Sequence, residues 1–304
     1  MTRIALLATG GTIACRQTEH GLTPALTGAE LIRGIPMSRD AELVSRDVFS
    51  MDSSNIQPEE WAQLARAIDQ SFQDCDGVVV THGTDTMGYT AAALSFMLLG
   101  QKKPVILTGS QLPLGAPLSD AESNLSCAIE AAMQGVPGTY VCFNRKLILG
   151  TRAVKTRTTS FDAFDSVNRS LSGMIDSEGV HFLRPQKIDR PYQLRASMDS
   201  RVFLLKLIPG TQPSVLDYVL TNGYRGLVIE AFGLGGLHYE APADRGDGKP
   251  GGVRRRGGGH PEGQAGVYHR CPLRSPSGQL FGLLSELYVQ QCTCDLRCQR
   301  GGDV

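Results

Sequence analysis

Short apolar runs alternate with longer amphipathic segments over the first 150 residues. Four runs are continuously apolar and predict buried strands, at residues 4–8, 77–80, 104–107 and 140–143. Three longer segments between them predict helices, at residues 59–72, 87–99 and 120–133. Strands without polar alternation, separated by helices, are typical of a parallel sheet that is covered on both faces. The pattern therefore predicts an α/β domain at the start of the chain.

A change in pattern divides the chain. Residues 185–200 place prolines and charges between apolar segments, which indicates a linker. A second α/β unit follows, with strands expected at 202–207 and 226–231, a helix at 213–220 and a glycine-rich loop at 232–237. We therefore expect an N-terminal domain over residues 1–184, the linker, and a smaller C-terminal domain over residues 201–304.

Residues 240–304 differ in composition from the rest of the chain. They contain 13 Gly and 5 Pro among 65 residues, against 22 Gly and 11 Pro among the first 239. The share of these two residues doubles where the second domain should complete its sheet, and only residues 280–289 could form a core element. Such composition is typical of disordered, low-complexity segments. We expect the smaller domain to be incomplete or altered; a translated frameshift or a misjoined coding segment is one hypothesis.

Charge and cysteine usage narrow the class of protein. The net charge is zero, which gives no electrostatic reason to expect binding to nucleic acid or to a membrane. No apolar run reaches the ~18 residues of a membrane-spanning helix, and the N-terminal run is too short for a signal peptide. Cys15, Cys75, Cys127 and Cys142 are scattered, as thiols are in a reducing compartment. We expect a cytoplasmic protein.

Two loops rich in threonine and glycine directly follow two of the expected strands. The first reads Thr9-Gly10-Gly11-Thr12, and the second reads Thr81-His82-Gly83-Thr84-Asp85. Ligands of open parallel sheets bind where the carboxyl ends of the strands meet the loops. Thr12 is a candidate nucleophile, but a hydroxyl needs a base or a polarising neighbour. These loops therefore predict a reaction centre at one edge of the sheet.

Further candidate groups follow in the same loops and beyond. Thr84 stands beside Asp85, and Lys155 lies in a polar segment after the fourth strand. Threonine, aspartate and lysine together suit the activation of a hydroxyl for acyl transfer. The backbone N–H groups of Gly11 and Gly83 could bind a carboxylate or a developing oxyanion.

Five segments in register resemble the bacterial-type L-asparaginase family, over roughly residues 1–239. In order they read Thr9-Gly10-Gly11-Thr12-Ile13, Met51-Asp52-Ser53-Ser54-Asn55-Ile56, Thr81-His82-Gly83-Thr84-Asp85-Thr86-Met87, Leu107-Thr108-Gly109-Ser110-Gln111 and Val154-Lys155-Thr156. The Asp-Ser-Ser form of the second motif is similar to that of the cytoplasmic, type I branch. We interpret the chain as an α/β protein with a flavodoxin-like N-terminal domain.

The resemblance implies a role for each motif. Thr12 would attack the side-chain amide carbon of L-asparagine, form a β-aspartyl ester and release ammonia. Thr84, Asp85 and Lys155 would form a second catalytic group. Ser53 and Ser54, together with Asp85, would hold the α-carboxylate and the α-ammonium group of the substrate. The resemblance implies no metal and no organic cofactor, and it implies a homodimer or homotetramer.

Two points stay open. The negative charge of Asp85 favours the charged ammonium form of Lys155. Lys155 therefore either loses its proton through burial and acts as a base, or orients Asp85 and polarises Thr84. In addition, the family has a tyrosine in the loop after the first motif, and residues 16–27 contain none. His20 and Thr23 are the nearest polar candidates, and neither is an obvious replacement.

Simpler explanations compete for several of these residues. Thr12 could cap a helix, and Asp85 and Thr86 could cap the helix that begins at residue 87. His82 fits a packed, hydrogen-bonded histidine better than a catalytic one. Cys271, Cys292, Cys294 and Cys298 lack the usual C-x2-C spacing of a zinc site. The arginine run at 254–256 fits a solvated segment better than a nucleic-acid patch.

The favoured function is hydrolysis of L-asparagine to L-aspartate and ammonia. The nearest alternative is a glutaminase or a transamidation-linked amidase of the same family. A second alternative, from another class, is an inactive amino-acid-binding relative with a defective C-terminal domain. Relative rates with asparagine and glutamine distinguish the first pair, and binding of aspartate without turnover would favour the last.

Overall fold

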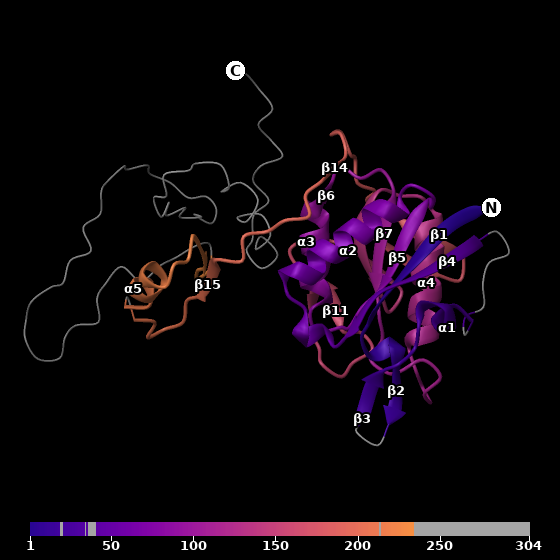
Figure 1. Ribbon diagram of the computed structural model, residues 1–304, viewed down its shortest axis with the longest axis horizontal. Coiled ribbons are helices and arrows are strands. Elements are labelled where there is room, and N and C mark those ends of the chain that lie inside the picture. The colour runs from indigo at the N-terminus through magenta and orange to yellow at the C-terminus, as the bar shows by residue number, and fades with distance from the viewer. Residues whose placement is uncertain (19–20, 34, 36–40, 213, 234–304) are drawn as a thin grey trace, which may run out of the picture. The chain divides into compact units, whose positions relative to one another are not determined.

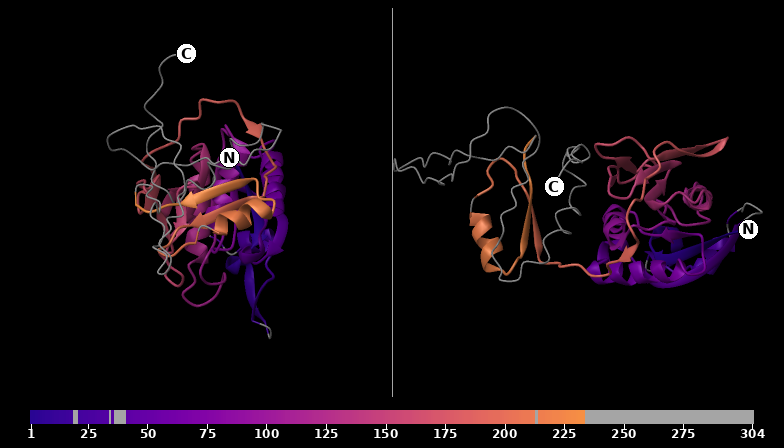
Figure 2. Two further views of the ribbon diagram at one scale, coloured as in Figure 1. Left: turned by 90° about the vertical axis from the view of Figure 1, so that its left-hand side faces the viewer. Right: turned by 90° about the horizontal axis from the view of Figure 1, so that it is seen from above.

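The computed structural model describes residues 1–18, 21–33, 35, 41–212 and 214–233. They belong to two units, Met1–Met198 and Asp199–Val304 (Figure 1 and Figure 2). Several features that the sequence analysis singled out lie outside the described residues. These are His20, residues 234–237 of the glycine-rich loop, the arginine run, residues 280–289, and Cys271, Cys292, Cys294 and Cys298.

The first unit is built on an eight-stranded sheet with the order β13-β12-β9-β8-β7-β5-β1-β4. Five adjacent strands are parallel: β1 (Thr2–Gly10), β4 (Ala41–Met51), β5 (Gly77–Thr81), β7 (Pro104–Thr108) and β8 (Gly138–Phe143). Numbered by their place in the chain, these strands lie in the order 2-1-3-4-5, which is that of flavodoxin-like folds. The expected α/β architecture, with its mainly parallel sheet, is confirmed.

Shorter strands that the apolar runs did not predict surround the parallel strands. An antiparallel extension of the sheet follows β8: β9 (Lys146–Leu149), β12 (Gly173–Asp176) and β13 (Gly179–Phe182). Further antiparallel pairs lie outside the sheet: β2 (Cys15–Thr18) with β3 (Gly21–Pro24), β6 (Leu98–Leu99) with β14 (Gln193–Leu194), and β10 (Ala153–Lys155) with β11 (Phe164–Ser166). The last pair carries Lys155.

Helices cover both faces of the sheet (Figure 1). The elements α2 (Pro58–Ser71) and α3 (Met87–Met97) pack on one face, and α1 (Gly28–Arg33) and α4 (Ala121–Met133) pack on the other. Successive strand residues alternate between the two faces: Leu7 packs in the core that contains α2 and α3, and Leu6 in the core that contains α1 and α4. Because both faces are buried, the central runs of β1, β5 and β7, at residues 4–8, 78–80 and 105–107, are apolar at every position.

The ends of α2 and α3 follow from local chemistry and from packing. The helix α2 begins at Pro58, and Gln57 and Glu60 form a capping box at its start. The expected helix at 87–99 ends at Met97 instead, because Leu98 and Leu99 form β6 and pair with β14. A local sequence pattern cannot predict pairing with a segment almost a hundred residues away.

The strand β4 was not predicted because it lies at the edge of the sheet. It contains 11 residues and is partly exposed along most of its length, and among the described strands it pairs only with β1. Its Arg46 reaches out to Ser71 Oγ at 2.6 Å and to Asp74 Oδ2 at 2.7 Å. An edge strand of mixed polarity has no continuous apolar run to reveal it.

Most of the expected linker packs on the first unit, which ends at Met198. Within it, Tyr192 donates a hydrogen bond to Asp69 Oδ1 at 2.6 Å, and its ring lies 6.0 Å from that of Phe72. Leu194, Ala196 and Met198 contact the core on the α2 and α3 side. The prolines and charges of this segment therefore reflect an extended chain on the domain surface.

The described part of the second unit is a single β-α-β element. It consists of β15 (Val202–Lys206), α5 (Ser214–Thr221) and β16 (Gly226–Glu230), with the two strands parallel. Among its described apolar residues, only Leu205 and Val219 are buried.

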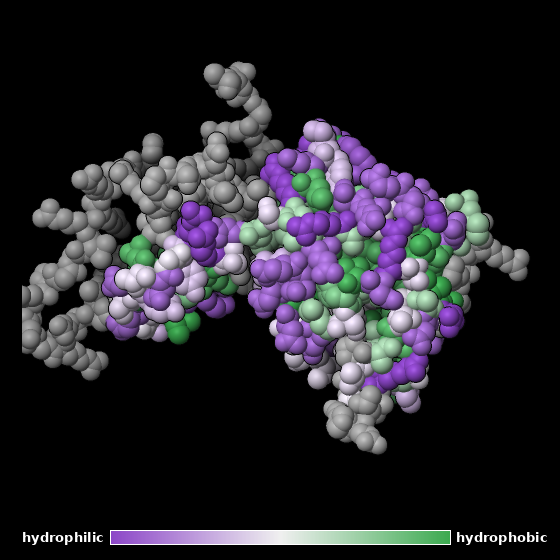
Figure 3. Space-filling view, viewed as in Figure 1, coloured by the Kyte–Doolittle hydropathy of each residue, from purple (hydrophilic) through white to green (hydrophobic). Residues whose placement is uncertain are grey.

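No helix among the described residues is long and apolar enough to cross a membrane. Hydrophilic residues are spread over the visible face of the first unit, with hydrophobic ones between them (Figure 3).

Candidate active site

Three loops meet where β4, β1 and β5 end, and they contain the first three motifs. The chain leaves β1 toward β4 on one side and leaves β5 toward β7 on the other, so the gap between β1 and β5 is a topological switch point. The Gly11 N–H donates a hydrogen bond to Met51 O at 3.1 Å and so joins the first two loops. Ligands of doubly wound sheets bind at this position.

Glycines allow these loops to approach each other closely. Gly11 has a φ of 76°, and a Cβ placed there would lie 2.4 Å from Gly83 N. A Cβ at Gly83 would lie 2.5 Å from Ser53 Oγ. Any larger residue at either position would push the loops apart. The glycines of two motifs thus bring the serine of a third motif into the same site.

Thr12 begins a single 3-10 turn, Thr12–Ala14, directly after Gly11. Gly11 occupies the cap position, so the interpretation of Thr12 as a helix cap is wrong. The Gly11 carbonyl accepts from Ala14 N–H at 3.1 Å and from the Cys15 thiol at 3.3 Å. Because the peptide unit is planar and trans, the Thr12 N–H points away from these donors. Burial, together with Asp52, raises the pKa of Cys15, so the thiol keeps the proton that it donates.

Lys155 joins Thr84 and Asp85. Its Nζ donates to Thr84 Oγ1 at 2.8 Å and to Asp85 Oδ1 at 2.6 Å. The Lys155 side chain is 16% exposed, whereas that of Asp85 is 61% exposed. Close packing of α3 on β10 makes the contact possible, since a Cβ at Gly88 would lie 2.5 Å from Ala153 O. The structure thus brings three of the candidate residues into one hydrogen-bonded group.

Gln111, to which the sequence analysis gave no role, continues this group. Thr84 donates to Gln111 Oε1 at 3.4 Å, and Gln111 Nε2 donates to the carbonyls of Thr158 at 2.8 Å and Ser160 at 2.9 Å. The two carbonyls require the amide NH2, which leaves the amide oxygen facing Thr84. The sequence could have indicated this role, because Gln111 belongs to the motif that directly follows β7, and β7 lies next to β5.

Ser53 and Ser54 differ in their surroundings. Ser53 is 3% exposed, and its carbonyl accepts from Thr86 Oγ1 at 2.8 Å. Ser54 is exposed, and its N–H and hydroxyl donate to Asp52 Oδ1 at 2.8 and 2.7 Å. These two hydrogen bonds lower the pKa of Asp52. Thr86 occupies the N-cap position of α3, as the capping interpretation expected, but its side chain makes no cap hydrogen bond to the helix and donates to Ser53 O instead.

His82 is a packed, hydrogen-bonded residue, as expected. It is fully buried, and its Nδ1 lies 2.7 Å from Gly83 O while its Nε2 lies 2.9 Å from Thr90 Oγ1. Trp61 Nε1 donates to the same Thr90 hydroxyl at 2.8 Å. Burial lowers the pKa of His82 to about 4, so the ring is neutral and holds the Gly83 loop in place.

A hairpin formed by β2 and β3 follows the Thr12 turn. It contains no tyrosine, and Thr23, one of the two polar candidates, lies exposed on β3 opposite Arg16. Arg16 forms an ion pair with Glu30 Oε1 at 3.0 Å, which ties the hairpin to α1. Glu30 also accepts from the Thr27 N–H at 2.9 Å at the start of that helix.

The chain matches the family model described as asparaginase, N-terminal, over residues 3–188. It is 39% identical to an L-asparaginase of Thermococcus kodakarensis over 78% of this chain and 73% of that protein. It is 37% identical to a glutamyl-tRNA(Gln) amidotransferase subunit of Archaeoglobus fulgidus over 76% of this chain. That match spans 59% of the Archaeoglobus protein, so the chain covers less than two thirds of this relative.

Solved structures agree with the sequence comparison. The thermostable L-asparaginase of Thermococcus kodakarensis matches with a TM-score of 0.74 and 38% identity, over 78% of this chain and 73% of that chain. A probable cytoplasmic L-asparaginase of Campylobacter jejuni matches with a TM-score of 0.67 and 31% identity, over 78% and 77% of the two chains.

Proposed function

The chain belongs to the asparaginase family and is an amidohydrolase; from this premise we propose that it hydrolyses L-asparagine to L-aspartate and ammonia. The observation that carries the proposal is the contact of Lys155 Nζ with both Thr84 Oγ1 and Asp85 Oδ1, beside the loop that holds Thr12. A hydroxyl, an ammonium and a carboxylate at one sheet edge suit amide hydrolysis through an ester.

In the first step, Thr12 Oγ1 attacks the side-chain amide carbon of asparagine. The carbonyl oxygen becomes an oxyanion, for which the Thr12 N–H, which points away from Ala14 and Cys15, and the N–H groups of the Gly83 loop are candidate donors. The C–N bond then breaks, the nitrogen takes up a proton and leaves as ammonia, and a β-aspartyl ester of Thr12 remains. Water cleaves this ester, which releases aspartate and restores the Thr12 hydroxyl.

Thr84, Lys155 and Asp85 would carry out the proton transfers that these steps require. Lys155 Nζ donates a hydrogen bond to each of its two neighbours, Thr84 Oγ1 and Asp85 Oδ1. We therefore favour the second of the two roles left open by the sequence, in which Lys155 orients Asp85 and polarises the Thr84 hydroxyl. The Thr84 hydroxyl would exchange a proton with the substrate or the attacking water, and Lys155 and Asp85 would hold it in place for this step.

The substrate's α-groups would bind next to these residues. Asp85, which is 61% exposed, has carboxylate surface left for the α-ammonium group. Ser53 and the N–H of Gly83 would face the α-carboxylate. The Gly11 N–H, which the sequence analysis also proposed, already donates to Met51 O at 3.1 Å, so Gly11 would serve the close approach of the loops instead. Ser54 already gives both of its donors to Asp52, so it would contact the substrate only by exchanging one of them.

Ammonia release from L-asparagine by the purified full chain tests the proposal. We expect Thr12→Ala to abolish release while the circular dichroism spectrum and the unfolding temperature stay unchanged. Thr12→Ser is the matched control, because it retains a hydroxyl and should retain part of the activity. Hydroxylamine should trap the ester as β-aspartyl hydroxamate in the wild type and not in Thr12→Ala. Equal release by Thr12→Ala and the wild type would contradict Thr12 as the nucleophile.

A second candidate is amide hydrolysis of glutamine, as in a transamidation-linked amidase. The observation that favours it is the set of relatives that are named as glutamyl-tRNA(Gln) amidotransferase subunits. Asparagine and glutamine differ by one methylene, which a pocket distinguishes by roughly 10- to 200-fold. A higher kcat/KM for glutamine would therefore favour this candidate. Aspartate binding without any turnover would instead favour the inactive amino-acid-binding relative.

The proposal includes a cytoplasmic homodimer or homotetramer. The relative titled a probable cytoplasmic L-asparaginase supports the location. The described cysteines Cys15, Cys75, Cys127 and Cys142 are free, which suits a reducing compartment. Light scattering of the purified chain would measure its mass in solution and test the oligomer.

A further inference from the structure

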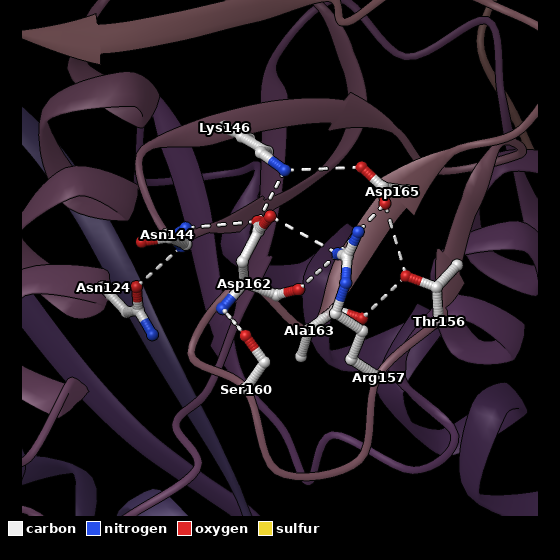
Figure 4. Close-up of polar contacts among 9 residues, drawn as sticks. All are labelled: Asn124, Asn144, Lys146, Thr156, Arg157, Ser160, Asp162, Ala163 and Asp165. Atoms are coloured by element: carbon white, nitrogen blue, oxygen red, sulfur yellow. Dashed lines mark hydrogen bonds and ion pairs between the residues drawn. The ribbon is translucent and has the colours of Figure 1, made fainter.

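Four charged side chains meet beside the strand pair that carries Lys155 (Figure 4). We call Lys146, Arg157, Asp162 and Asp165 the ion-pair cluster. Lys146 Nζ lies 2.5 Å from Asp162 Oδ1 and 3.3 Å from Asp165 Oδ1. Arg157 Nη1 lies 3.4 Å from Asp162 Oδ2 and 3.2 Å from Asp165 Oδ2. Each cation contacts both carboxylates, so the four charges form one closed network.

The cluster is joined to the strand pair that carries Lys155. In the antiparallel pair of β10 and β11, Lys155 lies opposite Phe164, and Val154 lies opposite Asp165. Thr156, the next residue after Lys155, donates its hydroxyl to Asp165 Oδ2 at 3.3 Å and its N–H to Ala163 O at 2.8 Å. A shift of Asp165 would therefore move the backbone that carries Lys155.

The same cluster ties this strand pair to the main sheet. Lys146 is the first residue of β9, which pairs with β8. Asn144, in the turn between these strands, donates to Asp162 Oδ1 at 3.1 Å, and its N–H donates to Asn124 Oδ1 of α4 at 2.9 Å. The loop between β10 and β11 is also held by Gln111, the neighbour of Thr84. The position of Lys155 thus depends on contacts from two sides.

The cluster is too exposed to be important for global stability. Its side chains are between 24% and 48% exposed, and exposed ion pairs contribute little because water and salt screen them. Burial opposes the charge of Lys146, yet its hydrogen bonds with Asp162 and Asp165 raise its pKa, and the hydrogen bond from Lys146 lowers the pKa of Asp162. The network instead fixes the relative positions of its four side chains beside the candidate site.

We propose that the ion-pair cluster is a positioning device for Lys155, with Asp165 as its central positioning residue. This inference rests on the proposed function, because it takes Lys155 as part of the catalytic group. Displacing Lys155 would lengthen its contacts with Thr84 and Asp85, which are made at 2.8 and 2.6 Å. Small misplacements of catalytic groups cost rate rather than stability.

The kinetic test compares Asp165→Asn with the wild type. The variant keeps the shape and removes the charge shared by Lys146 and Arg157. We expect kcat to fall roughly 10- to 100-fold, with little change in KM or in the unfolding temperature. The matched control is Asp176→Asn, a similarly exposed aspartate that pairs with His181 at 3.0 Å, and it should leave kcat unchanged. Unchanged kcat in Asp165→Asn, or a loss that follows unfolding, would overturn the proposal.

Two further measurements test the positioning role of the cluster separately from the proposed function. Lys146→Met should lower kcat as Asp165→Asn does, and Lys146→Arg should restore most of it, because the arginine returns the charge. Independently of activity, NMR of 13C-dimethylated lysines reports the environment of Lys155, whose signal is identified by its absence in Lys155→Arg. We expect that signal to shift in Asp165→Asn and not in Asp176→Asn. A wild type without ammonia release would refute the function, and an unshifted Lys155 signal would refute the positioning role.

Discussion

Lys155 and Asp85 are 70 residues apart in the chain, and 2.6 Å separate Lys155 Nζ from Asp85 Oδ1. Asp85 precedes α3, and Lys155 ends the short strand β10, which packs against the first turn of that helix at Gly88. The helix and the strand therefore set the ion pair, and Thr84 Oγ1 lies within reach of the same ammonium. This arrangement makes the Lys155 ammonium the central group of the candidate site.

Replacing Lys155 by methionine should inactivate the enzyme while leaving it folded. The change removes the ammonium that contacts Thr84 and Asp85, and we expect kcat to fall by at least about 100-fold, in the range of lost acid–base catalysis. Lys103→Met is the control, since Lys103 also donates two hydrogen bonds, to Phe72 O and Cys75 O, outside the site. Steady-state ammonia release and thermal unfolding distinguish the two. Comparable kcat in Lys155→Met and the wild type would contradict the role of Lys155.

Gly11→Ala should be far more harmful than Gly21→Ala. Both glycines have positive φ values, 76° and 97°, so both variants bear similar backbone strain. Only at Gly11 would the new Cβ collide with backbone, 2.4 Å from Gly83 N, whereas no atom of the described residues lies within 4 Å of a Cβ at Gly21. We expect Gly21→Ala to cost about 1–2 kcal/mol of unfolding free energy and Gly11→Ala to cost more and to abolish activity. Urea unfolding and ammonia release measure both effects, and equal costs would show that the loops can move apart.

Gln111→Glu should displace the loop after Lys155 and lower the rate. The amide NH2 of Gln111 donates to the carbonyls of Thr158 and Ser160, and a carboxylate in its place would repel both oxygens. We expect kcat to fall roughly tenfold or more, and raising the concentration of asparagine should not restore it. Gln57→Glu, at the start of α2, is a control for the change of charge. A wild-type kcat in Gln111→Glu would show that Thr84 does not depend on this loop.

His82 should make the protein less stable as the pH falls from about 6.5 to about 4. Burial lowers its folded-state pKa from 6.5 to about 4, so the unfolded chain binds the proton more readily in this range. The contribution of His82 is complete above pH 6.5 and declines as the pH falls toward 4, by roughly 3 kcal/mol in total. Unfolding free energies between pH 4 and 7 should therefore fall more steeply for the wild type than for His82→Gln. Equal slopes for the wild type and His82→Gln would contradict the assignment of this pH dependence to His82.

Much of the fold was predictable because the strands that build the sheet centre are buried on both faces. The runs around Leu7, Val79 and Ile106 are apolar at every position, and this pattern identifies them without any knowledge of their neighbours. The edge strand Ala41–Met51 escaped prediction because it is the last strand of the sheet among the described residues and is partly exposed, so polar residues interrupt it. The segment around Tyr192 escaped because its prolines and charges conceal how it packs on Phe72 and Asp69.

The sequence by itself determined the family motifs, the candidate residues Thr12, Thr84 and Lys155, and the α/β order of the elements. Only the tertiary structure decided which of these residues touch, and it added Gln111 and the ion-pair cluster. It also showed that Thr12 caps no helix and that His82 supports a loop. The physical reason is the distance along the chain over which each effect acts. A local pattern reports the burial of one segment, whereas contacts between distant residues depend on how strands and helices pack.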